Sequence, residues 1–127
     1  MAGELADDTV LDGALDVIAT ATSVYACSQA PTTYTEASST YALGTYTLTA
    51  GDGNGDWVIA NGDSSGRKIT LQAQSGNNGT GTGACTHLAF TVSTTLLFVT
   101  AASGDTINSG SPWTIGAYDV VEFSDPA

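Results

Sequence analysis

The sequence predicts a mainly β protein, either an antiparallel β-sandwich or a β-barrel of about eight short strands, with one N-terminal α-helix. Its 127 residues are the usual size of a single domain. The chain is rich in Thr, Ser and Gly, which favour strands and turns over helices. Short apolar or alternating segments recur after residue 23 without helical segments between them. We therefore expect a helical segment over 1–23, packed on the body or on a neighbouring subunit, and a β domain over 24–127.

Residues 8–21 have the apolar periodicity of a helix. The apolar side chains form two parallel rows, Leu11, Leu15 and Ile18 in one and Val10, Ala14 and Val17 in the other. Gly13 lowers helix stability by about 1 kcal/mol relative to Ala, so the helix needs a surface to pack against. The wide apolar face predicts burial on the body or at a neighbouring subunit.

The rest of the chain reads as short strands separated by turns. The expected strand segments are 24–28, 33–43, 45–49, 57–60, 68–73, 84–92, 96–100, 113–115 and 120–123. Segments 84–92 and 96–100 are expected to form a hairpin joined near Ser93 and Thr94. The Gly- and Asn-rich segment Ser75–Gly83 is predicted to be a flexible loop.

The charge balance excludes a nucleic-acid groove. Thirteen Asp and Glu residues face only two cations, Arg67 and Lys68, and the net charge is −11, whereas phosphate binding needs clustered Lys and Arg. No apolar stretch approaches the ~20 residues that cross a bilayer, and the acidic start lacks the basic residues of a secretory signal. We expect a soluble protein made without export. Arg67 and Lys68 fit two roles, pairing with an acidic patch on a neighbouring copy or protecting a strand edge.

One loop has partial calcium-loop spacing. Asp52, Asn54 and Asp56 alternate as the first ligands do, and Asp63 lies at the twelfth position. The sixth position is Trp57 where glycine is needed, and the twelfth is Asp rather than Glu. A solvent-facing turn is the favoured interpretation, and the four residues stay a weak metal candidate.

The two cysteines and the one histidine are candidate reactive groups. Cys27 and Cys85 lie in apolar contexts, which favours free buried thiols over a disulfide in a reducing cytoplasm. Cys85 and His87 point the same way on a strand, so a thiol–imidazole pair is conceivable. Because no third orienting group accompanies them, we favour a structural histidine. We expect no catalytic activity and no cofactor.

Aromatic residues offer a further alternative. Trp57 and Trp113, with the five tyrosines at positions 25, 34, 41, 46 and 118, could form a sugar-stacking platform like that of a carbohydrate-binding module. Aromatic side chains in small β domains more often build the core or a protein interface, which is the interpretation we favour.

Several segments together resemble a family of small virion structural proteins of tailed bacteriophages. These are Pro31–Ala37, Gly66–Leu71, Gly81–Phe90, Leu96–Thr100 and Glu122–Pro126. The resemblance implies a structural role without catalysis, with head decoration (cement) as the preferred function and a tail or surface component as the alternative. Cys85 departs from the small or hydroxylic residue usual at that position.

The same resemblance implies the partners and the location. We expect binding to the major capsid protein and self-association, with a trimer favoured, on the capsid exterior after synthesis in the host cytoplasm. Neither nucleic acid nor membrane is an expected partner. The residues predicted to lie in interfaces are Leu11, Leu15, Ile18, Trp57, Arg67, Lys68 and Trp113.

Overall fold

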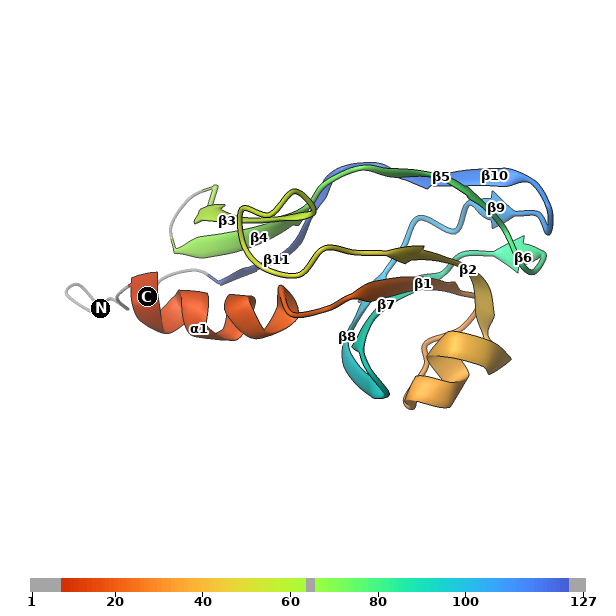
Figure 1. Cartoon of the computed structure of the whole chain (residues 1–127), viewed down its shortest axis with the longest axis horizontal. Helices are drawn as coiled ribbons and strands as arrows, with labels where there is room; N and C mark the ends of the chain where they lie inside the picture. The colour runs from red at the N-terminus through yellow and green to blue at the C-terminus, as the bar shows by residue number, and fades with distance from the viewer. Residues whose placement is uncertain (1–7, 64–65, 124–127) are drawn as a thin grey trace. The chain divides into compact units, whose positions relative to one another are not determined.

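The computed structural model describes residues 8–63 and 66–123, and it contains one N-terminal helix and a set of antiparallel strands (Figure 1). The elements are, in chain order, α1 (Asp8–Ile18), β1 (Ser23–Cys27), the short π-helix η1 (Glu36–Thr40), β2 (Ala42–Thr47), β3 (Trp57–Asn61), β4 (Arg67–Leu71), β5 (Gln74–Asn78), β6 (Gly83–Ala84), β7 (His87–Val92), β8 (Thr95–Ala101), β9 (Thr106–Ile107), β10 (Pro112–Ile115) and β11 (Tyr118–Phe123).

The predicted fold class is confirmed. The protein is mainly β with antiparallel pairing throughout its sheets and one N-terminal α-helix. The sheets do not close, so of the two predicted architectures the structure is sandwich-like and not a barrel. Within residues 8–63 and 66–123 eleven strands are found where about eight were expected, partly because β6 and β9 are only two residues long.

The chain divides into two compact units. Of the described residues, unit 1 comprises 8–20, 49–63, 66–73 and 117–123, and unit 2 comprises 21–48 and 74–116. Strands β3, β4 and β11, which lie within the β domain expected over 24–127, therefore group with the helix. Each unit is described by itself below.

Unit 1 is a three-stranded sheet with a helix packed against it. The strand order is β11-β4-β3, and α1 contacts β4 and β3 (Figure 1). Leu15 from the helix and Trp57, Ile69 and Leu71 from the sheet are fully buried. Because β4 alternates buried Ile69 and Leu71 with partly exposed neighbours, one of its faces forms the core of this unit, as the alternation in its sequence predicted.

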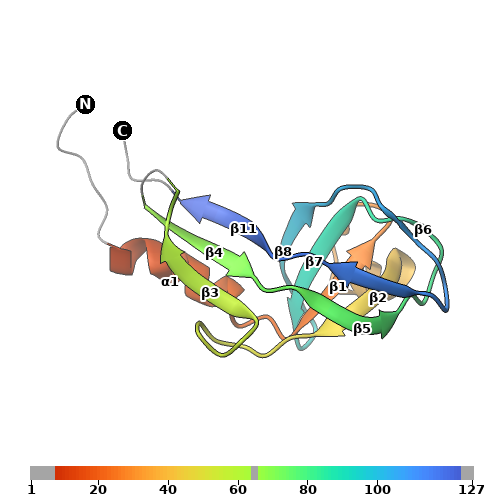
Figure 2. The ribbon, with the colours of Figure 1, turned by 90° about the horizontal axis from the view of Figure 1, so that it is seen from above.

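Unit 2 contains a four-stranded sheet of order β2-β1-β7-β8 (Figure 2). It also contains two smaller sheets, β10-β5 and β6-β9, whose strands are labelled in Figure 1. The hairpin predicted for its longest strands is confirmed, since β7 and β8 pair antiparallel with Val92 opposite Thr95. Ser93 and Thr94 form the turn, and Ser93 has a positive φ of 50°.

The larger sheet of unit 2 and the β10-β5 sheet pack together through an aromatic pair. The Tyr46 and Trp113 rings lie 4.6 Å apart at their centroids with an interplanar angle of 50°, and the Tyr46 hydroxyl donates a hydrogen bond to the carbonyl oxygen of Trp113. Gly44 gives the indole room, because a Cβ at that position would lie 2.7 Å from its Cε2 and Nε1 atoms. The close approach of β2 to Trp113 therefore depends on a glycine.

Two expectations for unit 2 are wrong. Residues 33–43 were expected to be a strand, but η1 occupies Glu36–Thr40 and only the last two residues belong to β2. The Thr33 hydroxyl accepts a hydrogen bond from the Glu36 amide at 3.1 Å, and the Glu36 carboxylate accepts from the Thr32 amide at 2.8 Å. These two hydrogen bonds tie Glu36 to the residues before it and favour a helical turn over the β propensity of the Thr- and Tyr-rich segment.

The second correction concerns Ser75–Gly83, which was expected to be a flexible loop. Part of it forms β5, which pairs with β10 so that Asn78 lies opposite Pro112 and Asn77 opposite Trp113. Of β5 only Gln74 is buried, so this strand has no apolar alternation from which it could be predicted.

Candidate interaction surface

The helix α1 presents its two apolar rows to different surroundings. Leu15 is fully buried, Ile18 is buried and Leu11 is half-buried, so the row predicted to form an interface belongs to the core of unit 1. Val10 and Val17 in the other row are 69% and 55% exposed, and Ala14 between them is exposed as well. The exposed row Val10, Ala14 and Val17 is therefore the apolar face that the helix leaves uncovered.

An ion pair fixes which row faces the sheet. Arg67 on β4 donates to Asp12 on α1 through two contacts, Nε to Oδ1 at 2.7 Å and Nη2 to Oδ2 at 3.3 Å. Arg67 also donates from Nη1 to the Asn61 side-chain oxygen at 2.9 Å. This two-point contact holds the helix in one rotation about its axis, with Leu15 toward the sheet and Val17 away from it.

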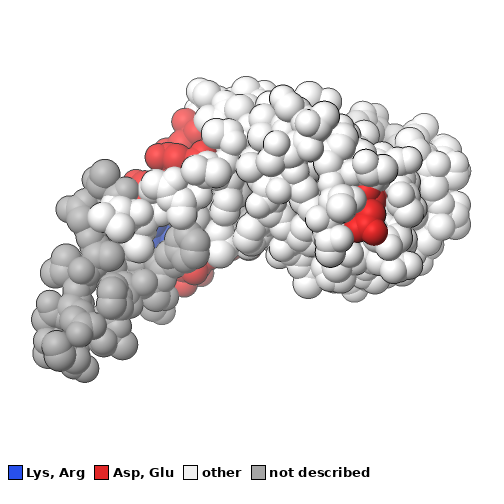
Figure 3. Space-filling view, turned by 90° about the horizontal axis from the view of Figure 1, so that it is seen from below, with Lys and Arg blue, Asp and Glu red and all other residues white. Residues whose placement is uncertain are grey.

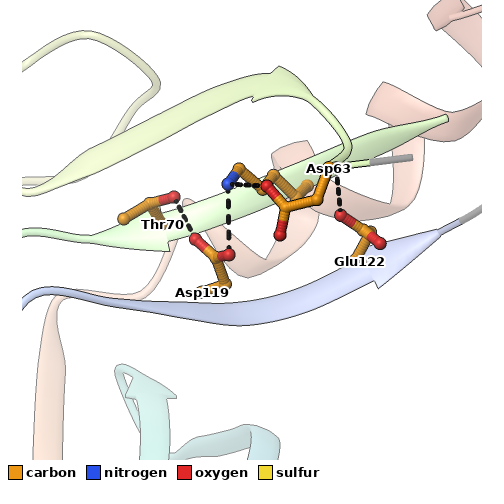
Figure 4. A network of polar contacts seen from close by, with 5 residues as sticks. Asp63, Thr70, Asp119 and Glu122 are labelled. Atoms are coloured by element: carbon orange, nitrogen blue, oxygen red, sulfur yellow. Dashed lines mark hydrogen bonds and ion pairs between the residues drawn. The ribbon is translucent and has the colours of Figure 1, made fainter. Parts of the chain in front are cut away.

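Lys68 lies at the centre of a polar network on the same sheet. Figure 4 labels four other members of this network, Asp63, Thr70, Asp119 and Glu122. Its ammonium group contacts Asp63 Oδ1 at 2.7 Å and Asp119 Oδ2 at 3.1 Å, and Thr70 donates to the other oxygen of Asp119 at 2.9 Å. The hydrogen bond to Asp63, followed by that to Asp119, raises the pKa of Lys68. Glu122 joins the network by accepting from the Asp63 amide at 2.6 Å.

Both cations of the chain are thus used within unit 1. Arg67 binds the helix and Lys68 binds the loop at Asp63 and strand β11. Of the two roles considered for them, protection of a strand edge is wrong, because β4 is the central strand of the β11-β4-β3 sheet. Pairing with another copy would require these internal contacts to be given up.

The residues with calcium-loop spacing make hydrogen bonds within their own segment. Asp52 Oδ1 accepts from the Ile59 amide at 2.8 Å, and Asp56 Oδ2 accepts from the Thr49 amide at 2.6 Å. Asn54 donates to the carbonyl oxygen of Ala50 at 2.9 Å, while Asp63 binds Lys68. Within residues 8–63 and 66–123, no three His, Cys, Asp or Glu side chains gather as a metal site would require. The three loop residues therefore close a turn, and Asp63 lies in a different contact.

The thiols are free and buried, as predicted. Burial, followed by the charge of Cys85, raises the pKa of Cys27 to about 12. Burial is likewise the main cause of the raised pKa of Cys85. Cys85 Sγ contacts the backbone carbonyl oxygen of His87 at 3.5 Å, and His87 Nδ1 lies 2.9 Å from the Thr86 hydroxyl. Since a protonated thiol is a poor nucleophile, these contacts describe packing and not an activated thiol–imidazole pair.

The two tryptophans belong to the interior. Trp57 is fully buried in unit 1, and Trp113 is 8% exposed in unit 2. Stacking on a sugar requires an exposed ring face, so neither residue supplies the aromatic platform considered above. Both are core residues, in line with the favoured interpretation of the aromatic side chains.

Charge is distributed unevenly between the units. Unit 2 contains Glu36 and Asp105 as its only Asp, Glu, Lys or Arg residues, and the other acidic residues that the structure describes, with both cations, belong to unit 1. Figure 3 shows one face on which unit 2 is white apart from a single acidic group. The surface of unit 2 is therefore made of neutral polar and apolar side chains, with few charges to desolvate on contact with a partner.

Neither the exposure of the row Val10, Ala14 and Val17 nor the pairing of Asp12 with Arg67 was predicted from the sequence. The two apolar rows were visible in the sequence, but nothing local to the helix distinguishes them.

Comparison with protein-family models, with curated proteins and with solved structures gives no match for this chain. No helix in the described part of the chain is long and apolar enough to cross a bilayer.

Proposed function

We propose that this chain is a structural protein of a tailed-phage virion, and specifically a capsid decoration protein that binds the major capsid protein and stabilises its lattice. The phage assignment rests on the resemblance of its segments to small virion proteins. The observation that supports an attachment role is the exposed row Val10, Ala14 and Val17, displayed on a helix whose opposite row and whose Asp12 are fixed to the sheet.

A helix held in this way suits attachment to another protein. The exposed row is apolar and continuous along the helix, so a partner groove can cover it without desolvating a charge. Asp16 is also exposed on this helix, next to Val17, so a basic residue at the rim of the groove would complement it. The sheet behind the helix is already formed, so little conformational entropy is lost on binding.

The net negative charge of the chain suits a protein that is present in many copies on one particle. A net charge of −11 keeps free copies apart before assembly and disfavours binding to packaged DNA. When a partner covers the helix row, most of this charge is on unit 1, and the surface of unit 2, with only two acidic residues, is available for neighbouring protein.

The experiment is the protein composition of virus particles purified from the source of this sequence. Quantitative mass spectrometry against labelled standards compares the chain with the major capsid protein in the same particles. A copy number comparable to that of the capsid subunit is expected for a decoration protein. A few copies per particle would indicate the alternative, a tail or surface component. Complete absence from purified particles would contradict the proposal.

A further inference from the structure

Strand β8 forms an open edge of the four-stranded sheet of unit 2. The strand order β2-β1-β7-β8 places it outermost beside β7 (Figures 1 and 2). Its sequence, Thr95–Ala101, contains no charged residue, proline or glycine, and Leu96–Val99 are all apolar and only half-buried. A long neutral edge of this kind carries a row of backbone groups that a further strand can bond.

Strand β2, at the opposite edge of the same sheet, is occupied. The carbonyl oxygen of Leu43 accepts from the amides of Thr80 and Gly81 at 2.8 and 3.1 Å. The carbonyl oxygen of Thr45 accepts from the Asn77 side chain at 2.8 Å. Backbone acceptors on β2 are thus already used by the 77–81 segment. This edge therefore does not offer a further strand an unoccupied row of backbone hydrogen-bonding groups.

The edges of the sheet in unit 1 are also protected. On β3, the carbonyl oxygen of Trp57 accepts from the Gly53 amide and the Ile59 amide donates to Asp52, so the preceding loop covers this strand. On β11, the charged side chains of Asp119 and Glu122 disfavour pairing with another acidic chain. Among the described residues of the two larger sheets, β8 is therefore the edge that lacks both a covering segment and a charge.

We propose that β8 pairs antiparallel with β8 of a second copy of this chain, so that two four-stranded sheets join into one sheet about a two-fold axis. A sheet with one open and one occupied edge can extend only open edge to open edge, which gives a closed dimer and not a ring. A β-bulge at Leu97 interrupts the register of β8 with β7, since Phe98 lies opposite Phe90 and Leu96 opposite Thr91. A pairing centred on Phe98 brings the apolar segments Leu96–Val99 of the two copies together across the axis.

Side-chain packing and charge also support a second copy of this chain as the partner of β8. Leu96 and Val99 pack against the cluster of Cys27, Ala37 and Ala89, and the ring of Phe98 lies 6.5 Å from that of Phe90. The apolar side chains of β8 are thus already ordered, and a second strand would cover what they still expose. Unit 2 carries only Glu36 and Asp105, so two strongly acidic chains can approach here with little repulsion.

The experiment measures the mass of the purified full chain in solution. Sedimentation equilibrium over a wide concentration range is applied to the wild-type chain, to Leu97→Lys on β8 and to Thr47→Lys on β2. Thr47 is exposed at the occupied edge of the same sheet, so its variant makes the same charge change away from β8. We expect dimers for the wild type and for Thr47→Lys, and monomers for Leu97→Lys with an unchanged circular dichroism spectrum.

Hydrogen exchange gives a second measurement that does not depend on a variant. Dilution below the dissociation range is expected to increase the exchange of β8 amides while leaving those of β1 unchanged. A wild-type chain that stays monomeric at every concentration would overturn the proposal, as would a Leu97→Lys variant that dimerises like Thr47→Lys. Because these measurements use the isolated chain, their outcome is separate from that of the virion proposal.

Discussion

Asp12 and Arg67, 55 residues apart in the chain, form a two-point ion pair that joins α1 to β4. Their side chains are 28% and 18% exposed, so the pair is partly shielded from water and screened less than a surface ion pair. This contact selects the row of the helix that enters the core and the row that is left outside.

The first prediction concerns this ion pair. Asp12→Asn keeps the size of the side chain but removes its charge, and we expect it to lower the free energy of unfolding by about 1–2 kcal/mol. Asp16→Asn on the same helix is the control, because Asp16 is exposed and its replacement should change stability by less than about 0.5 kcal/mol. Urea denaturation measures both. Equal effects of the two variants would show that the pair does not hold the helix.

The second prediction concerns Gly44 beneath Trp113. An added Cβ would lie 2.7 Å from a buried indole, so Gly44→Ala is expected to lower the free energy of unfolding by about 1–3 kcal/mol and to change the near-ultraviolet circular dichroism of Trp113. Gly116 belongs to the same unit, and a Cβ there would meet nothing within 4 Å. Gly116→Ala should therefore be close to neutral. A neutral Gly44→Ala would mean that the indole is not seated against β2.

The third prediction concerns pH. The pKa of Cys27 is raised from 9.0 to about 12, so the folded chain retains the thiol proton at pH values where the unfolded chain loses it. Its contribution to stability is complete below about pH 9 and is lost as pH rises toward 12. We expect the free energy of unfolding to fall between these values, and to fall less steeply for Cys27→Ala. Denaturation at a series of alkaline pH values measures the slope, and identical slopes would contradict this account.

The fourth prediction concerns Gly13, which lies in the helix where an added Cβ would meet nothing within 4 Å. Gly13→Ala should stabilise the helix by about 0.5–1 kcal/mol, because alanine loses less backbone entropy on folding. Thermal unfolding followed by far-ultraviolet circular dichroism measures the change. A loss of stability would mean that this helix position is covered in the free protein.

The sequence predicted the elements with strong periodicity and missed those without it. The helix, the β7–β8 hairpin and strand β4 have apolar patterns that identify them. Strand β5 is polar along most of its length and is defined by its pairing with β10, which no local pattern encodes. The turn η1 did have a local signal, the Thr33 and Glu36 spacing of a capping box, but the Thr-rich composition around it was interpreted as a strand.

The candidate surface was harder to predict because both helix rows are apolar. Leu15 and Val17 are equally acceptable as core or interface residues when only the sequence is considered. What distinguishes them is Arg67, which approaches Asp12 from a distant strand. In the same way, Trp57 and Trp113 are residues of the type that forms a sugar-stacking platform, and only their burial, each in a different unit, identifies them as core residues.

The most direct test of the central claim, attachment of this chain to a capsid through the exposed row of α1, is co-sedimentation of the purified chain with particles assembled without it. Val17→Glu places a charge in the exposed row, and Ala73→Glu makes the same charge change at an exposed position of unit 1 outside the helix. We predict that the wild type and Ala73→Glu bind the particles and that Val17→Glu, although as stable as the wild type, does not. Failure of the wild type to bind, or undiminished binding of Val17→Glu, would contradict the account.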